Sequence, residues 1–193
     1  FNVANLNYQS INIFNFTNIF ANLSYSTRDD AIQNTTRAEG INSVRTATNS
    51  NFPRDIYTAS GRIDKRSKNL KGGLSINYNF SDFNNVINDT PTESSNFTQR
   101  YRANVATNFR DKPNLEIGYT YSIRDYKTGD VQSKFFTDAP YVQVDAYFLK
   151  GFVFKSKYTY NYYRNQEQTL NEYRFLEAEL SYNQQGSRWE FGV

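Results

Sequence analysis

Paired carboxylates and paired ammonium groups are the side chains of this sequence with the clearest chemical potential. Glu177 and Glu179 are spaced i, i+2, and so are Lys155 and Lys157. Residues two apart in a strand point to the same side, so each pair would present its charges on one surface. Two carboxylates can serve a glycosidase when they flank a substrate. Carboxylates balanced by the neighbouring lysines are the simpler interpretation, and we adopt it.

Two absent residue types exclude several other chemistries. The 193 residues contain no His and no Cys. Ser–His–Asp and Cys–His nucleophilic sites are therefore excluded, as are thiolate metal centres. Asp29, Asp30 and Asp82 belong to no ligand series of the kind that a calcium loop requires. We expect no catalytic residue, no cofactor and no metal site, and hence no enzyme.

The composition is unusual in its aromatic residues. With 16 Tyr, 16 Phe and one Trp, aromatic side chains make up 17% of the chain. The mean hydropathy of -0.77 resembles that of a soluble protein. A transmembrane β-barrel has a similar average, because half of each strand faces water. The net charge of +3 is small and its Lys and Arg are scattered, so we expect no nucleic-acid partner.

Residues 70–83 carry the clearest strand pattern. Leu74, Ile76, Tyr78 and Phe80 alternate there with Ser and Asn, which predicts one apolar and one polar face. The alternation recurs in about ten segments. We place these strands at 2–9, 14–28, 54–66, 70–83, 97–109, 114–126, 138–149, 152–164, 172–183 and 188–193. The sequence therefore predicts an all-β, antiparallel up-and-down sheet.

Charge is segregated between the two faces of these predicted strands. The strand positions on the apolar face carry almost no charge, and Lys65 at a strand end is the main exception. The positions on the opposite face carry Arg62, Asp64, Arg102, Glu116, Asp145, Lys155, Lys157, Glu177, Glu179 and Glu190. A charge on the lipid-facing side of a barrel costs about 2–4 kcal/mol at the bilayer midplane. We therefore predict that these charged residues face a water-filled lumen and that the strands form a transmembrane β-barrel.

Short and long connections alternate along the predicted sheet. We place tight turns at Ser10–Ile13, Ser67–Leu70, Arg110–Pro113, Leu149–Gly151 and Gln184–Ser187. Long polar loops are expected at Arg28–Arg54, Asp82–Asn96, Lys127–Asp138 and Asn165–Asn171. Aromatic residues gather toward both ends of the strands, with Phe109, Phe148, Phe152 and Trp189 near the turns and Phe80, Phe97, Tyr101, Tyr121 and Tyr162 near the loops. Two aromatic girdles and unequal connections are typical of an outer-membrane barrel.

The turns also predict which residues face each other across neighbouring strands. The turn at Leu149–Gly151 sets Phe148 opposite Phe152, and hence Asp145 opposite Lys155. The turn after Phe109 sets Val105 opposite Tyr119 and Tyr101 opposite Ile123. A symmetric loop after Arg164 brings Lys157 near Glu179.

Two stretches give the chain a family resemblance. The segments "LKGGLSINYNFSDF" at 70–83 and "RYRANVATNFRDKPNLEIGYTYS" at 100–122 resemble the C-terminal barrel of TonB-dependent-receptor-like outer-membrane proteins. The resemblance implies a barrel of up to about 22 strands with an N-terminal plug. It also implies a bacterial outer-membrane location, with membrane lipid, the energy-coupling protein TonB and a surface lipoprotein as partners. Residues 1–193 contain neither a plug-like domain nor a TonB box, so we expect part of one barrel domain completed by further strands.

Three functions remain open at this point. The first is the barrel portion of a TonB-dependent receptor that takes up a nutrient across the outer membrane. The second is a structural barrel subunit of a secretion or surface-protein complex, without transport activity of its own. The third is a soluble carrier barrel, whose apolar face would line an internal cavity. The sequence does not identify the nutrient.

Overall fold

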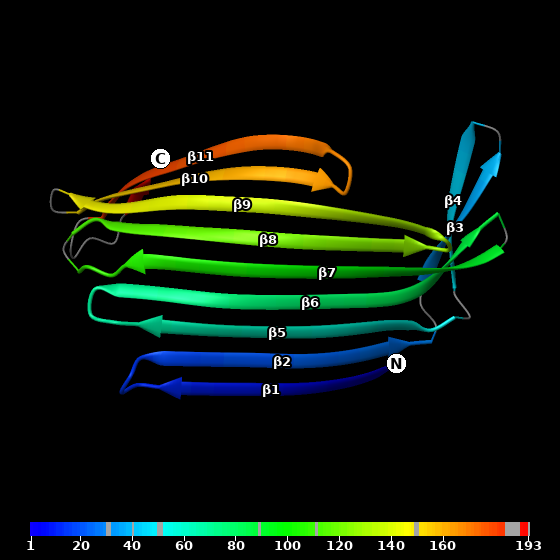
Figure 1. The fold of residues 1–193 in the computed structure, drawn as a ribbon, viewed down its shortest axis with the longest axis horizontal. Coiled ribbons are helices and arrows are strands. Elements are labelled where there is room, and N and C mark those ends of the chain that lie inside the picture. The colour runs from blue at the N-terminus through cyan, green and yellow to red at the C-terminus, as the bar shows by residue number, and fades with distance from the viewer. Residues whose placement is uncertain are drawn as a thin grey trace.

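The computed structural model describes residues 1–29, 32–39, 41–49, 52–88, 90–110, 112–148, 151–183 and 190–192. Every regular element in these ranges is a β-strand (Figure 1). The strands are β1 (Asn2–Asn12), β2 (Thr17–Arg28), β3 (Ile32–Glu39), β4 (Asn42–Asn49), β5 (Arg54–Arg66), β6 (Leu70–Ile87), β7 (Thr90–Thr107), β8 (Asn114–Thr128), β9 (Val131–Phe148), β10 (Phe152–Asn165), β11 (Thr169–Asn183) and β12 (Glu190–Gly192).

Ten of these strands form one continuous antiparallel sheet. Its order is β1-β2-β5-β6-β7-β8-β9-β10-β11-β12, so each strand pairs with the next one along this path. The predicted all-β, up-and-down antiparallel architecture is therefore confirmed. The sheet does not close into a barrel, and within the described residues β1 and β12 do not pair with each other.

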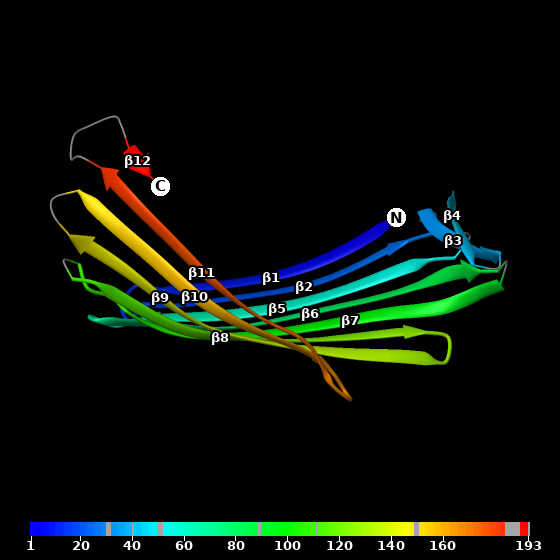
Figure 2. The same cartoon turned by 90° about the horizontal axis from the view of Figure 1, so that it is seen from above.

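The sheet is coiled rather than flat. Figure 2 shows β10 and β11 crossing the direction of β1 to β7 steeply, while both edges of the sheet bend to the same side. Strands twist because of backbone sterics, and the twist accumulates along a long sheet. The outcome is a convex face and a concave face.

The segment predicted as the polar loop Arg28–Arg54 contains a hairpin instead. β3 and β4 pair there in antiparallel register from Ile32↔Asn49 to Glu39↔Asn42. β3 also pairs in parallel with the end of β6, at Thr35↔Val86 and Thr36↔Ile87, and the hairpin stands away from the main sheet (Figure 1). Its sequence is rich in Thr, Asn and Ser, so the apolar alternation that reveals a half-buried strand is missing.

Two of the other three predicted long loops are also wrong, whereas the connection between β10 and β11 at 166–168 lies inside the predicted loop Asn165–Asn171. The residues of Asp82–Asn96 extend β6 and β7 into a hairpin that ends at Asn88, whose φ is 49°. Those of Lys127–Asp138 extend β8 and β9 around Gly129, whose φ is 57°. A tight hairpin turn needs such left-handed residues, which Asn and Gly adopt most readily. These extensions lack a regular apolar alternation, because Phe83, Val86, Phe135 and Phe136 follow no single two-residue period, so they read as loops in the sequence.

Shorter turns were predicted with mixed success. The connection between β5 and β6 lies at 67–69, close to the predicted Ser67–Leu70. The turn after β1 lies later than predicted, because the Asn12 side-chain oxygen accepts hydrogen bonds from the backbone N–H groups of Phe14 and Asn15. The predicted turn Gln184–Ser187 lies outside the described residues, and so does Trp189.

The predicted register is right between β9 and β10 and wrong in two other places. Phe148 lies opposite Phe152 and Asp145 opposite Lys155, as predicted. Val105 faces Ile117 instead of Tyr119, and Tyr101 faces Tyr121 instead of Ile123. Lys157 faces Glu177, and Lys155 faces Glu179.

Local hydrogen bonds explain both register errors. Asn114 accepts from the Phe109 N–H and donates to the Phe109 carbonyl, which ends β7 at Thr107 and lengthens the turn. Between β10 and β11 the loop is shorter than assumed, because the Asn165 N–H donates to the Gln168 carbonyl at 3.0 Å, and a bulge at Tyr163/Arg164 then shifts the register by one residue. Each error is two residues, so every side chain keeps its predicted face.

The described sheet forms a single layer with almost no interior. Ala106 and Tyr141 are its only buried hydrophobic residues among those described. The chain exposes 14169 Å², whereas a compact protein of 22.5 kDa exposes about 9,500 Å². An amphipathic sheet must cover its apolar face with another layer or with lipid.

Candidate functional site on the polar face of the sheet

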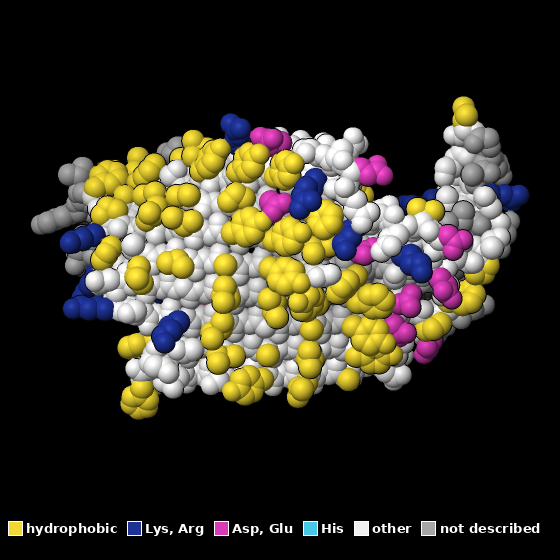
Figure 3. Space-filling view, in the orientation of Figure 1, with side chains coloured by type: hydrophobic (Ala, Val, Ile, Leu, Met, Phe, Trp, Pro, Cys, Tyr) yellow, Lys and Arg dark blue, Asp and Glu magenta, His cyan; other side chains and the backbone are white. Residues whose placement is uncertain are grey.

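The convex face of the sheet is apolar over the middle of its strands. Figure 3 shows hydrophobic side chains spread over this face, with charged side chains toward the strand ends and along one edge. In β8 the apolar positions run from Leu115 to Ile123, eight residue steps or about 27 Å along the strand. At the usual barrel tilt of about 40° the band would be about 21 Å tall, close to the roughly 25 Å apolar band of membrane barrels.

Aromatic rings lie at both ends of this band. Toward the long hairpins, a chain of neighbouring rings runs from β2 to β9 through Tyr25, Tyr57, Phe80, Phe97, Tyr78, Tyr101, Tyr121 and Phe136, with centroid separations of 4.8 to 6.5 Å. At the tight-turn end, Phe152 contacts Phe148 at 5.8 Å and Tyr182 at 4.6 Å. The rings thus lie at the two ends predicted from the sequence.

A few charges on the convex face were not predicted, and they lie beside the aromatic chain. Arg164 and Asp138 form an ion pair of 3.7 Å, and the Arg164 guanidinium lies 4.7 Å from the Phe136 ring centroid. Tyr119 donates its hydroxyl to Asp138. These charges are paired or stacked, so the apolar band between the two aromatic zones stays nearly free of charge.

The pairing places the charged residues singled out from the sequence on the opposite, concave face. Residues paired directly across antiparallel strands point to the same side. One cross-strand row joins Arg62, Ser75 and Arg102; a second joins Asp64, Gly73, Asn104, Gly118 and Tyr141; a third joins Glu116, Gln143, Lys157 and Glu177. Asp145, Lys155 and Glu179 form a fourth. Glu190 lies in β12, and its side chain is outside the described part of the structure.

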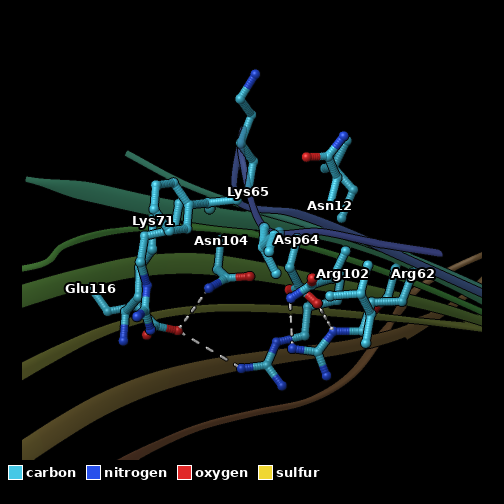
Figure 4. A pocket seen from close by; sticks show the side chains of 17 residues that line it. Asn12, Arg62, Asp64, Lys65, Lys71, Arg102, Asn104 and Glu116 are labelled. Atoms are coloured by element: carbon cyan, nitrogen blue, oxygen red, sulfur yellow. Dashed lines mark hydrogen bonds and ion pairs between the residues drawn. The ribbon is translucent and has the colours of Figure 1, made fainter. Parts of the chain in front are cut away.

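Four of these residues surround one hollow. Arg62 and Asp64 on β5, Arg102 on β7 and Glu116 on β8 line a space of about 590 Å³ near the tight turns (Figure 4). Lys71 joins them from β6. Asn12 on β1 and Asn18 on β2 also line it, so the hollow is built across six neighbouring strands, from residues far apart in the sequence.

Arg62 and Asp64 form the tightest ion pair of the hollow. The Arg62 Nε and Nη2 atoms donate to the two carboxylate oxygens of Asp64 at 2.6 and 3.0 Å. A two-pronged contact of this kind fixes both side chains. Gly73 makes room for it, because a β-carbon at position 73 would lie 2.6 Å from Asp64 Oδ1.

Tyr141 is the centre of the second polar cluster. Its hydroxyl donates to Glu116 Oε1 at 2.6 Å and accepts from Arg102 Nη2 at 2.8 Å. Asn104 donates to the same carboxylate oxygen at 3.2 Å. Tyr141 is only 6% exposed, and the ammonium group of Lys157 lies 5.2 Å from its ring centroid. The cluster ties β7, β8, β9 and β10 together.

The remaining predicted residues lie farther along the same face and outside the hollow. Lys155 forms an ion pair with Glu179 at 3.6 Å, and Lys157 faces Glu177 across the strands. Asp145 accepts a hydrogen bond from Gln143 at 3.1 Å. The paired carboxylates thus have lysines opposite them, in the arrangement preferred over a glycosidase site.

The sequence interpretation missed several residues of this face. Tyr141, Asn104 and Lys71 were not singled out. Tyr141 lies two and four residues before Gln143 and Asp145, so the two-residue period of the strand places it on the same face and could have identified it. Asn104 lies two residues from Arg102 on the same face, and Lys71 lies on the same face as Ser75 and Asn77.

The side chains of the site can form hydrogen bonds and ion pairs. Its side chains supply guanidinium, ammonium and amide donors, a tyrosine hydroxyl and carboxylate acceptors. Among the described residues no group of three or more His, Cys, Asp or Glu is placed to hold a metal ion. The polar face is suited to hold a solute or a protein segment through hydrogen bonds and charge.

Comparisons with known proteins leave the family open. No protein-family model matches the chain, and no curated protein matches it either. In the part of the chain that the structure describes, no helix has the length and apolar character needed to span a membrane.

Proposed function

We propose that this sheet is part of the wall of a bacterial outer-membrane β-barrel of the TonB-dependent receptor type, which takes up a nutrient. One observation carries the proposal: the sheet is a single layer whose convex face is apolar and uncovered. Soluble monomers seldom expose apolar patches larger than several hundred Å². Lipid would cover this face, and the polar concave face would line a water-filled lumen.

The shape of the sheet supports a wall of this kind. A sheet that spans a membrane must pair every backbone group, so its edges have to close. β1 and β12 would be closed by further strands of the same barrel. A plug inside the lumen, TonB and a surface lipoprotein are the partners that the family resemblance adds.

The membrane part of the proposal is tested with two adjacent residues. The chain contains no Cys, so Ile76→Cys and Asn77→Cys each create a single labelling position on β6. After insertion into liposomes, a fluorophore at Ile76 on the convex face should be quenched by brominated lipid. A fluorophore at Asn77 on the concave face should be quenched by aqueous iodide.

The labelling experiment also has a clear negative result. Equal quenching of both positions by iodide would show that neither face contacts lipid. A detergent-free, monodisperse monomer that binds a hydrophobic dye would point instead to the soluble carrier. In either case the barrel proposal fails.

The β3–β4 hairpin favours a second candidate, a structural barrel subunit of a secretion or surface-protein complex. Ile41 and Val44 are exposed on it, Ile41 fully and Val44 by 53%. An exposed hairpin that carries two apolar side chains at the rim of a barrel is suited to hold another protein. Deleting residues 30–51 would then release the partner complex without abolishing the uptake of any nutrient, whereas a receptor would retain its partners.

A further inference from the structure

The two halves of the concave face differ in charge. On β1, β2 and β5–β8 the described side chains of this face include the cations Arg28, Arg54, Arg62, Arg66, Lys71, Arg100, Arg102 and Arg124. The acids on the same strands and face are Asp64 and Glu116. On β9–β11 the cations Lys155 and Lys157 face the acids Asp145, Glu177 and Glu179. Positive charge is therefore concentrated on the half that carries the hollow.

The acids of this half do not neutralise its cations. Asp64 is held by Arg62, and Glu116 lies 3.9 Å from Arg102 and also accepts from Tyr141. Within the described part of the chain, Lys71 and Arg100 have no ion-pair partner. Both are exposed on the concave face, so their charge is available to a ligand.

The hollow provides the space and the other contacts that a ligand needs. Its volume of about 590 Å³ lies within the range of about 300–1,000 Å³ that is typical of small-molecule sites. Asn104 and Ser75 contribute polar atoms beside the cations. Arginine recognises carboxylate and phosphate groups through paired hydrogen bonds, and a concave wall of one charge concentrates ions of the opposite sign.

We infer that the concave face of β5–β8 binds a small solute carrying several carboxylate or phosphate groups. The inference rests on the proposed function, since it assigns a substrate class to the lumen wall. Asn, Ser and Thr between the cations would bind the hydroxyl groups of such a solute. An acidic protein segment is the competing occupant, but a hollow of this size favours a small ligand.

The test is isothermal titration of the full chain, inserted in liposomes, with citrate and with inorganic pyrophosphate. The variant Lys71→Gln/Arg100→Gln removes two cations that hold no other described side chain. Its matched control, Lys127→Gln/Arg174→Gln, removes the same two residue types from the convex face. Lys71 lines the hollow, and one charge about 6 Å from an anion in a water-like dielectric changes its affinity about threefold; Arg100, farther along the same face, adds to this through the field of the wall.

The expected results separate this inference from the proposed function. Citrate or pyrophosphate should bind, at least about threefold more weakly to Lys71→Gln/Arg100→Gln and equally well to the control. High salt should weaken binding, and spermidine should not bind at this site. Equal weakening in both variants, or binding of an acidic peptide but of neither small anion, overturns the inference. If the anion site is absent but the proposed function holds, Ile76 and Asn77 should still show the quenching pattern expected for a barrel wall. A sheet that never enters lipid would not show that pattern, so the two failures are distinguishable.

Discussion

The phenol ring of Tyr141 in β9 fills the space above Gly118 in the neighbouring strand β8. A β-carbon built on Gly118 would overlap ring atoms of Tyr141, including Cζ and the hydroxyl oxygen. The two residues are directly paired across the strands. An aromatic ring that covers a glycine shields the backbone there and specifies register. The position also aims the Tyr141 hydroxyl at Glu116 and Arg102.

Gly118→Ala should therefore destabilise the sheet by about 1–3 kcal/mol, as expected for an overpacked site. The ring of Tyr141 would have to leave the position from which it contacts Glu116. Gly61→Ala is the matched control, because its new β-carbon would lie 3.4 Å from the Ile76 side chain, an ordinary contact. Urea unfolding in liposomes measures both. Equal effects of the two substitutions would contradict the close packing at Gly118.

Tyr141→Phe should cost about 1.5–3 kcal/mol, because Glu116 and Arg102 each lose a hydrogen bond to the hydroxyl. The ring itself, and its cover over Gly118, would remain. Tyr158→Phe serves as control, since Tyr158 is 42% exposed on the convex face; its effect should stay within about 0.5 kcal/mol. If Tyr141→Phe also stays in that range, the cluster around Glu116 does not stabilise the sheet.

Val142→Lys and Gln143→Lys place the same charge on opposite faces of β9. Val142 lies in the convex apolar band between Ile117 and Tyr158, so a lysine there should cost about 2–4 kcal/mol if lipid covers it. Gln143 faces Glu116 on the concave face, and a lysine there should be tolerated. The yield of folded protein in liposomes measures the difference. Similar yields from both variants would argue against lipid on the convex face.

Cysteine pairs decide the register of β10 and β11. The structure sets Lys157 opposite Glu177, whereas a symmetric loop would set it opposite Glu179. Disulfide formation needs β-carbons about 3.5–4.5 Å apart. Lys157→Cys/Glu177→Cys should therefore oxidise faster than Lys157→Cys/Glu179→Cys, as seen by mobility on a non-reducing gel. If Lys157→Cys/Glu179→Cys oxidised faster instead, the register expected from a symmetric loop would be correct.

The sequence was most informative where a strand separates two solvents. Leu74, Ile76, Tyr78 and Phe80 alternate with Ser and Asn because one side of β6 is apolar and the other is polar. The same period assigned Arg62 and Glu116 to one common face. Because side-chain direction repeats every two residues, a register error of two residues leaves each side chain on the same face. These faces were therefore predictable even where the pairing was wrong.

The sequence was uninformative where both sides of a strand are polar. β3, β4 and the far ends of β6–β9 lack apolar alternation, so they resemble loops. Their strand structure depends on pairing with a neighbour, which no single segment encodes. The hairpin at Asn88 and the parallel contact between Thr35 and Val86 illustrate this dependence.

By itself, then, the sequence determined that this protein is built of amphipathic strands with charge on one face, because side-chain direction depends only on position along a strand. The tertiary structure alone decided which charges meet. Arg102 and Glu116 come together because hydrogen bonds at Asn114 and the ring of Tyr141 over Gly118 set the register of β8 against its neighbours β7 and β9. Such long-range pairing results from contacts between residues distant in the chain, and a local pattern does not record it.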